Sequence, residues 1–187
     1  MTPPGMQRRR LAAAGLLALL PVRRAMASAG ELQPRLPPPP LVLRDADDRP
    51  YPLAQRLRGH ATAVHLMFTG CSSTCPPQAA LFATLAQALP ANASLLSISI
   101  DTVGDTPATL AGWLQRFGRP PQWQAAVPAP RDMDALVAWL RGPGARSDTH
   151  TAQVFLVDRR GCLCYRSGDL PAARSMLAAL AALSRET

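Results

Sequence analysis

Residues 62 to 77 read TAVHLMFTGCSSTCPP, and this stretch decides the fold. Residues 62 to 68 are apolar at nearly every position, which is typical of a β-strand covered on both faces. The proline pair after Cys75 fits only the first turn of a helix, because proline has no backbone N–H to donate. Cys71 and Cys75 are therefore expected where a buried strand gives way to the N-terminus of a helix.

The rest of the chain alternates strand and helix patterns. Two short apolar runs flank a turn cluster at residues 45 to 48 and predict an opening β-hairpin. Further strands are expected at 94–100, 123–127, 153–157 and 162–165, and helices at 76–89, 106–117, 132–141 and 171–183. This alternation predicts an α/β protein, a three-layer α/β/α sandwich with an N-terminal β-hairpin. Thioredoxin-like folds place their reactive cysteines at such a strand-to-helix junction, so the predicted fold is thioredoxin-like.

The first 27 residues have the order of a secretory signal peptide. Three arginines (Arg8 to Arg10) precede an apolar run at 11–22, and small residues at 25–29 offer a cleavage site. The run is shorter than the roughly 18 to 20 residues that span a bilayer. The arginine pair before Leu11 is compatible with twin-arginine export. We expect cleavage, a periplasmic protein and no transmembrane span in the mature chain; a retained anchor is the alternative.

The 187 residues allow one domain with a tail. Residues 28–40 end in four prolines and are predicted to form an extended linker, which assigns the folded domain to 41–187.

The net charge of +8 does not indicate nucleic-acid binding. All 20 basic residues are arginine, and five of them lie in the first 27 residues, which hold no acid. The other 15 face 12 acidic residues and are scattered along the chain rather than gathered in a stripe.

The four cysteines carry the chemistry. In an oxidising compartment Cys71, Cys75, Cys162 and Cys164 would become disulfides unless a reductant or a metal prevents it. A helix N-terminus favours thiolate, the form needed for thiol–disulfide exchange and for binding a soft metal. Two thiolates leave Cu(I) under-coordinated, and one imidazole would complete a three-coordinate site that suits copper. Structural zinc wants four ligands, and we find no fourth candidate.

His150 is the histidine whose position suits this site. It lies in a polar loop just before the strand at 153–157, and in a thioredoxin-like arrangement that loop lies against the start of the cysteine helix. His65, in the middle of a buried strand, is expected to be a hydrogen-bonded core residue. His60 is expected on the surface.

Three separated stretches resemble the SCO/SenC family of copper chaperones for respiratory oxidase assembly. Residues 68–76 (FTGCSSTCP) look like its F-x-x-C-x-x-x-C-P motif. Residues 97–107 resemble its strand followed by D-T-P, and residues 148–161 resemble its D-H-[ST] loop, strand and turn. The resemblance implies a copper site made by Cys71, Cys75 and His150. The chain departs from the family in having Ser72-Ser73 where many members have Pro-Asp and in a short segment before His150. Many relatives are membrane-anchored, whereas this chain is expected to be exported and released.

This resemblance implies a binding protein that delivers copper, Cu(I) or Cu(II), to a respiratory oxidase subunit or another copper protein. The alternative is a thiol–disulfide reductase for cysteines of a metal-site apoprotein, with Cys71 attacking, Cys75 resolving and a periplasmic thiol reductant as a further partner. The two roles can coexist, because a disulfide cannot bind the metal. A peroxidase is disfavoured because the residues before Cys71 lack the proline and threonine spacing of a peroxide pocket. An inert domain stapled by a disulfide is the remaining alternative.

Cys162 and Cys164 are not part of the family pattern. Two apart on a strand, they are expected to share a face near a hairpin turn and to behave as small buried hydrophobes. A secondary metal or redox pair is the alternative.

Overall fold

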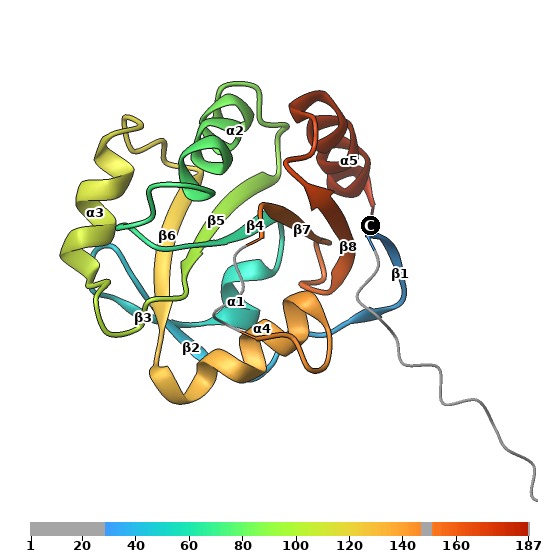
Figure 1. Cartoon of the computed structure of the whole chain (residues 1–187). Coiled ribbons are helices and arrows are strands. Elements are labelled where there is room, and N and C mark those ends of the chain that lie inside the picture. The colour runs from blue at the N-terminus through green and yellow to red at the C-terminus, as the bar shows by residue number, and fades with distance from the viewer. Residues whose placement is uncertain (1–28, 147–150, 187) are drawn as a thin grey trace, which may run out of the picture.

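A computed structural model of the chain describes residues 29–146 and 151–186 (Figure 1). The strands are β1 (Gly30–Leu36), β2 (Val42–Asp45), β3 (Pro50–Pro52), β4 (Ala61–Met67), β5 (Ala93–Ser99), β6 (Trp123–Pro128), β7 (Gln153–Val157) and β8 (Leu163–Asp169). The helices are α1 (Leu53–Leu57), α2 (Cys75–Gln87), α3 (Pro107–Gln115), α4 (Met133–Arg141) and α5 (Ala173–Arg185), with a 3₁₀ turn η1 (Pro130–Asp132) before α4.

The strands form one mixed sheet in the order β1-β8-β7-β4-β5-β6-β2-β3. The central pairs β4·β5 and β5·β6 are parallel, whereas β7 runs antiparallel to β4. Every residue of β4 and β5 is buried, as expected for strands with a layer of helices on each face. The Cys71–Cys75 loop follows the carboxyl end of β4, so it lies beyond the carboxyl ends of the central parallel strands.

Two hydrophobic clusters make the fold a three-layer sandwich. One cluster lies under α2, α3 and α5 and includes Phe82, Trp113 and Trp123. The other lies against α1 and α4 and includes Leu53 and Leu136. Figure 1 shows the two groups of helices on opposite faces of the sheet. The predicted thioredoxin-like α/β/α architecture is therefore confirmed.

The predicted hairpin is also confirmed, as the antiparallel pair β2·β3. Its turn is held by the buried Asp45, whose carboxylate accepts hydrogen bonds at 2.9 Å from the backbone N–H groups of Asp47 and Arg49. This hairpin extends the sheet beyond β6. Helix α1, which follows it directly, has no counterpart in the sequence prediction; its five residues bury only Leu53 and Leu57.

The linker prediction for residues 28–40 is wrong for residues 30–36. Residues 30–36 form β1, an edge strand that pairs antiparallel with β8. An edge position tolerates Pro34, because the outer side of an edge strand needs no ladder hydrogen bonds. Arg35 anchors the strand through ion pairs of 2.9 Å with the buried Asp158 and 2.5 Å with Glu186. The folded domain thus begins near residue 30 instead of 41.

The predicted signal peptide at 1–27 lies outside the described residues and stays a prediction. Within the described ranges, the helices are all too short or too polar to cross a bilayer.

Candidate functional site

Cys75 is the first residue of α2, and its backbone N–H donates a hydrogen bond to the Cys71 sulfur at 3.2 Å. The next two residues of the helix, Pro76 and Pro77, have no N–H group. The Cys75 amide is thus one of the few free donors at this helix start, and it is directed at the other cysteine of the pair. The spacing of four residues therefore brings the two cysteines into direct contact.

The two thiols differ in exposure and acidity. Burial disfavours the Cys71 thiolate, but the Cys75 thiol and the backbone N–H groups of residues 73, 75 and 74 stabilise it, so the pKa of Cys71 lies below its usual value. Burial, reinforced by the hydrogen bond with Cys71, raises the pKa of Cys75 to about 12. Cys71 is partly exposed and Cys75 is buried, and neither forms a disulfide. Cys71 is thus the accessible, more acidic member of the pair.

The loop before Cys71 is held by Asp105, a residue that is only 6% exposed. Its carboxylate accepts hydrogen bonds from the Thr69 backbone N–H at 2.9 Å, from the Thr69 hydroxyl, and from the Ser99 hydroxyl at 2.6 Å. Asp105 thereby ties the end of β5 and the start of α3 to the cysteine loop. Sequence reasoning used Asp105 only as part of a motif and missed this role, although the motif itself was the signal.

His150, the third predicted ligand, lies outside the described residues. The chain resumes at residue 151, two residues before β7, which runs antiparallel to β4 with Val64 opposite Phe155. The start of β7 therefore lies beside the end of β4 from which the cysteine loop emerges. The side-chain amide of Gln78, in the first turn of α2, also donates to the Gln153 carbonyl at 2.8 Å.

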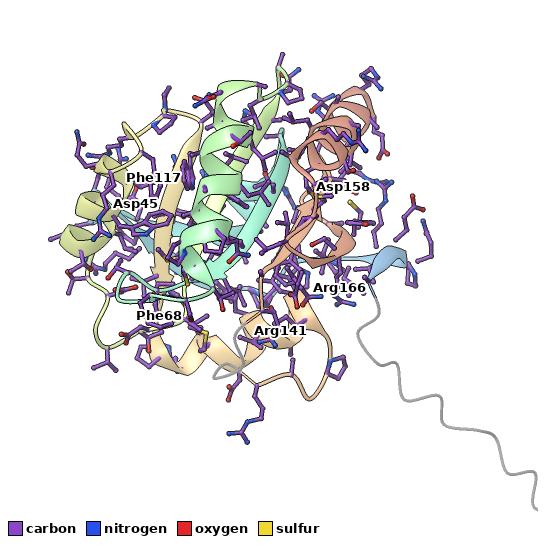
Figure 2. All side chains as sticks on the ribbon, turned by 45° about the horizontal axis from the view of Figure 1, so that its top comes forward. Asp45, Phe68, Phe117, Arg141, Asp158 and Arg166 are labelled. Atoms are coloured by element: carbon purple, nitrogen blue, oxygen red, sulfur yellow. The ribbon has the colours of Figure 1, made fainter. Side chains whose placement is uncertain are left out.

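Arg141 holds the chain on the other side of the gap, at residue 146, where the described residues stop. Its guanidinium is buried at the end of α4 and donates to the Arg146 carbonyl at 2.9 Å. Figure 2 shows Phe68, which leads into the cysteine loop, and Arg141 toward the same edge of the molecule in that view. Asp158 follows the opposite end of β7 and lies away from both.

Within the part of the chain that the structure describes, no three His, Cys, Asp or Glu side chains cluster so as to hold a metal ion. Cys71 and Cys75 could supply two soft ligands to a metal ion, and a third protein ligand would then come from residues outside that part. Two thiolates and one imidazole would suit copper.

The remaining cysteines lie elsewhere. The predicted strand placement of Cys162 is wrong: β8 begins at Leu163, and the Cys162 amide donates to Asp158 in the preceding turn. Cys164 is buried, its thiol donates to the Leu156 carbonyl at 3.3 Å, and burial raises its pKa to about 12. A small buried hydrophobe was the right prediction for Cys164, whereas Cys162 is half-buried in a turn.

The other two histidines match their predictions. His65 is fully buried, lies 2.5 Å from the Ser97 hydroxyl and stacks on Phe82 with ring centroids 4.0 Å apart. His60 is exposed.

The family model described as SCO1/SenC matches residues 43–185, more than half of the chain. The chain belongs to the SCO1/SenC family. The match covers both cysteines and the segment from β2 to α5, which confirms the resemblance drawn from the motifs. No curated protein matches the chain in sequence.

Solved structures of Sco proteins share its fold. BsSco, described as a member of the Sco family of cytochrome c oxidase assembly proteins with a disulfide switch, has a TM-score of 0.68 at 17% identity, covering 82% of this chain and 96% of that one. Bradyrhizobium japonicum ScoI with copper bound gives 0.64 at 22% identity, covering 79% and 99%. Yeast Sco1 with copper bound gives 0.61 at 18% identity, covering 81% and 90%. At these identities the likeness concerns the fold.

One departure from the family pattern is exposed at the site. Ser72 and Ser73 both lie on the surface of the cysteine loop. The loop therefore presents neutral hydroxyl groups at the position where many members carry an acidic side chain.

Proposed function

We propose that this SCO1/SenC protein binds copper through Cys71, Cys75 and His150 and delivers it to a respiratory oxidase. Copper is the cargo of this process. The single observation that carries the proposal is the contact between the two cysteines at the start of α2, where the Cys75 amide donates to the Cys71 sulfur. The copper-bound relatives with the same fold add support.

The placement of each ligand has a chemical consequence. The hydrogen bond from the Cys75 backbone amide favours the thiolate form of Cys71, and a soft cation binds the thiolate. The buried Cys75 would close the site on its inner side, whereas the partly exposed Cys71 would be open to a ligand from the receiving protein. His150 would complete a three-coordinate site from a segment anchored by Arg141 on one side and by β7 on the other. Copper would then leave by stepwise exchange of these ligands for those of the acceptor.

We infer export to the periplasm from the signal-like residues 1–27. In that compartment the redox state of the cysteine pair would control loading, because a disulfide between Cys71 and Cys75 has no thiolate to offer. A thiol reductant would return the two electrons and two protons that restore the pair.

The test is an anaerobic Cu(I) titration of the reduced chain from Ser28 against a competing chelator. The proposal expects one tightly bound equivalent, weakened about tenfold or more in His150→Ala and abolished in Cys71→Ser. His60→Ala is the matched control, because His60 is an exposed histidine. Equal affinity of the wild type and His150→Ala would contradict the three-ligand site.

The asymmetry of the two thiols favours a second candidate, thiol–disulfide reduction. The Cys71 thiolate would attack a substrate disulfide and release one substrate thiolate, giving a mixed disulfide. The Cys75 thiolate would then attack the Cys71 sulfur, which releases the second substrate thiol and leaves Cys71–Cys75 oxidised. Turnover of a disulfide substrate that is unaffected by His150→Ala, without tight copper binding, would establish this role in place of delivery.

A further inference from the structure

A polar groove of about 320 Å³ lies at the opposite end of the sheet from the cysteine loop. It is formed by α1 and the loop after it, by the first residues of β5, and by the segment that enters β6. Its polar lining residues are Gln55, Arg56, Arg58, His60, Ser94, Gln122 and Gln124. Ser94 is the second residue of β5, whereas Cys71 follows the far end of the parallel strand β4. The length of these strands, seven residues each, separates the two places by roughly 20 Å.

Arg56 is the central cation of this groove. Its Nε–H donates to the Gln124 side-chain oxygen, and its Nη1 donates to the Ser94 hydroxyl at 3.3 Å. These bonds fix the plane of the guanidinium but use only part of its five N–H donors. Burial lowers the pKa of Arg56, and no carboxylate among the described residues offsets that cost. Among the described residues, this half-buried guanidinium is thus held in place without a carboxylate counter-ion, and its ionisable neighbour is the phenol of Tyr51.

The rest of the lining is also suited to an anion. Arg58 and His60 are exposed at its rim and add a second cation and an imidazole. The Gln124 oxygen is occupied by Arg56, which leaves the NH₂ group of the same amide to donate. The nine lining residues include no Asp or Glu. Donors therefore outnumber acceptors, the reverse of what a cation site requires.

We propose that this groove binds a small oxyanion of the phosphate or sulfate type. The unused N–H groups of Arg56 form a fork that matches two oxygens of such an ion, and charge-assisted bonds of this kind are the stronger class. Arg58, His60 and the Gln124 amide surround the remaining oxygens. The site is separate from the copper ligands, so it stands or falls independently of the proposed function.

Calorimetric titration of the purified full-length chain with inorganic phosphate, and separately with sulfate, at constant ionic strength tests the proposal. We expect saturable binding that is weakened about tenfold in Arg56→Gln, with a smaller loss in Arg56→Lys, which keeps the charge and loses the fork. Arg131→Gln is the matched control, since the Arg131 side chain is 87% exposed and far from the groove in sequence and fold; it should bind as the wild type does.

A second measurement uses the wild-type protein alone and so does not depend on whether a variant folds. In amide NMR spectra of the wild type, phosphate should shift the signals of Ser94, Gln122 and Gln124 and leave those of residues 69–75 unchanged. Absence of saturable binding up to about 10 mM, equal loss in Arg56→Gln and Arg131→Gln, or shifts confined to residues 69–75 would each overturn the proposal. So would binding of an acidic peptide at this groove together with indifference to phosphate and sulfate.

Discussion

Replacing Asp105 by alanine should destabilise the protein and loosen the cysteine loop. The Asp105 carboxylate is buried and accepts three hydrogen bonds, two from Thr69 and one from Ser99. Alanine leaves these three donors without an acceptor at the point where the cysteine loop meets the end of β5. The change therefore acts on the fold and on the site at once.

The magnitude follows from those three bonds. A hydrogen bond to a charged group contributes about 1.5 to 3 kcal/mol, and water can reach the partly exposed Thr69 and recover some of the loss. We expect Asp105→Ala to lower the free energy of unfolding by about 3 to 4 kcal/mol, or the melting temperature by roughly 10 °C. Asp105→Asn should cost only about 1 kcal/mol, because an amide oxygen still accepts and the Thr69 hydroxyl can turn to accept from the new NH₂ group.

Urea unfolding and alkylation kinetics provide the assay. In Asp105→Ala the buried Cys75 thiol should react faster with iodoacetamide at native conditions, because the loop that covers it is less well held. Asp101→Ala is the matched control. Asp101 lies with Asp105 in the loop between β5 and α3 and accepts a hydrogen bond from the Gly104 amide at 2.7 Å, but this contact is exposed. Asp105→Ala that is no less stable than Asp101→Ala, with unchanged Cys75 reactivity, would refute the reasoning.

Three further predictions concern single side chains. Burial lowers the pKa of His65 to about 4, so as the pH falls this histidine takes up a proton in the unfolded protein before it does so in the folded one. The free energy of unfolding should therefore fall by about 3 kcal/mol between pH 7 and pH 4, and by less in His65→Phe. Urea titrations at both pH values measure this difference. Because the pKa of Cys71 is lowered, alkylation followed by peptide mapping should modify Cys71 at a lower pH than free cysteine, with Cys75 unmodified; a midpoint at or above that of free cysteine would contradict this. Cys164→Ala should cost about 1 kcal/mol in thermal unfolding and leave Cu(I) stoichiometry unchanged; a lost copper equivalent would implicate Cys164 in binding.

Most of the architecture could be predicted because its patterns are local. β4 and β5 are unbroken apolar runs, and α3 begins with a threonine cap followed by Pro107, as its sequence predicts. β1 could not be recognised in the same way. It is polar, contains Pro34 and is stabilised by partners more than a hundred residues away, including Asp158 and β8. Its strand character is a property of the assembled sheet.

The same distinction between local sequence patterns and contacts in the folded chain applies to the candidate site. The position of Cys71 and Cys75 at a strand-to-helix junction follows from residues 62–77 alone. The difference between the two thiols depends on burial and on hydrogen bonds at the start of α2, and the support from Asp105 joins the cysteine loop to β5 and to the start of α3. Only the folded chain supplies these contacts. Arg56 is a similar case, because a sequence shows an arginine but not that the described residues around it include no carboxylate.

The most direct test of the central claim is X-ray absorption spectroscopy of the reduced protein loaded with one equivalent of Cu(I). The account predicts a copper ion coordinated by two sulfur atoms and one nitrogen, with the nitrogen lost in His150→Ala and a sulfur lost in Cys71→Ser or Cys75→Ser. Coordination without sulfur, or a sulfur shell that persists unchanged in both serine variants, would contradict it.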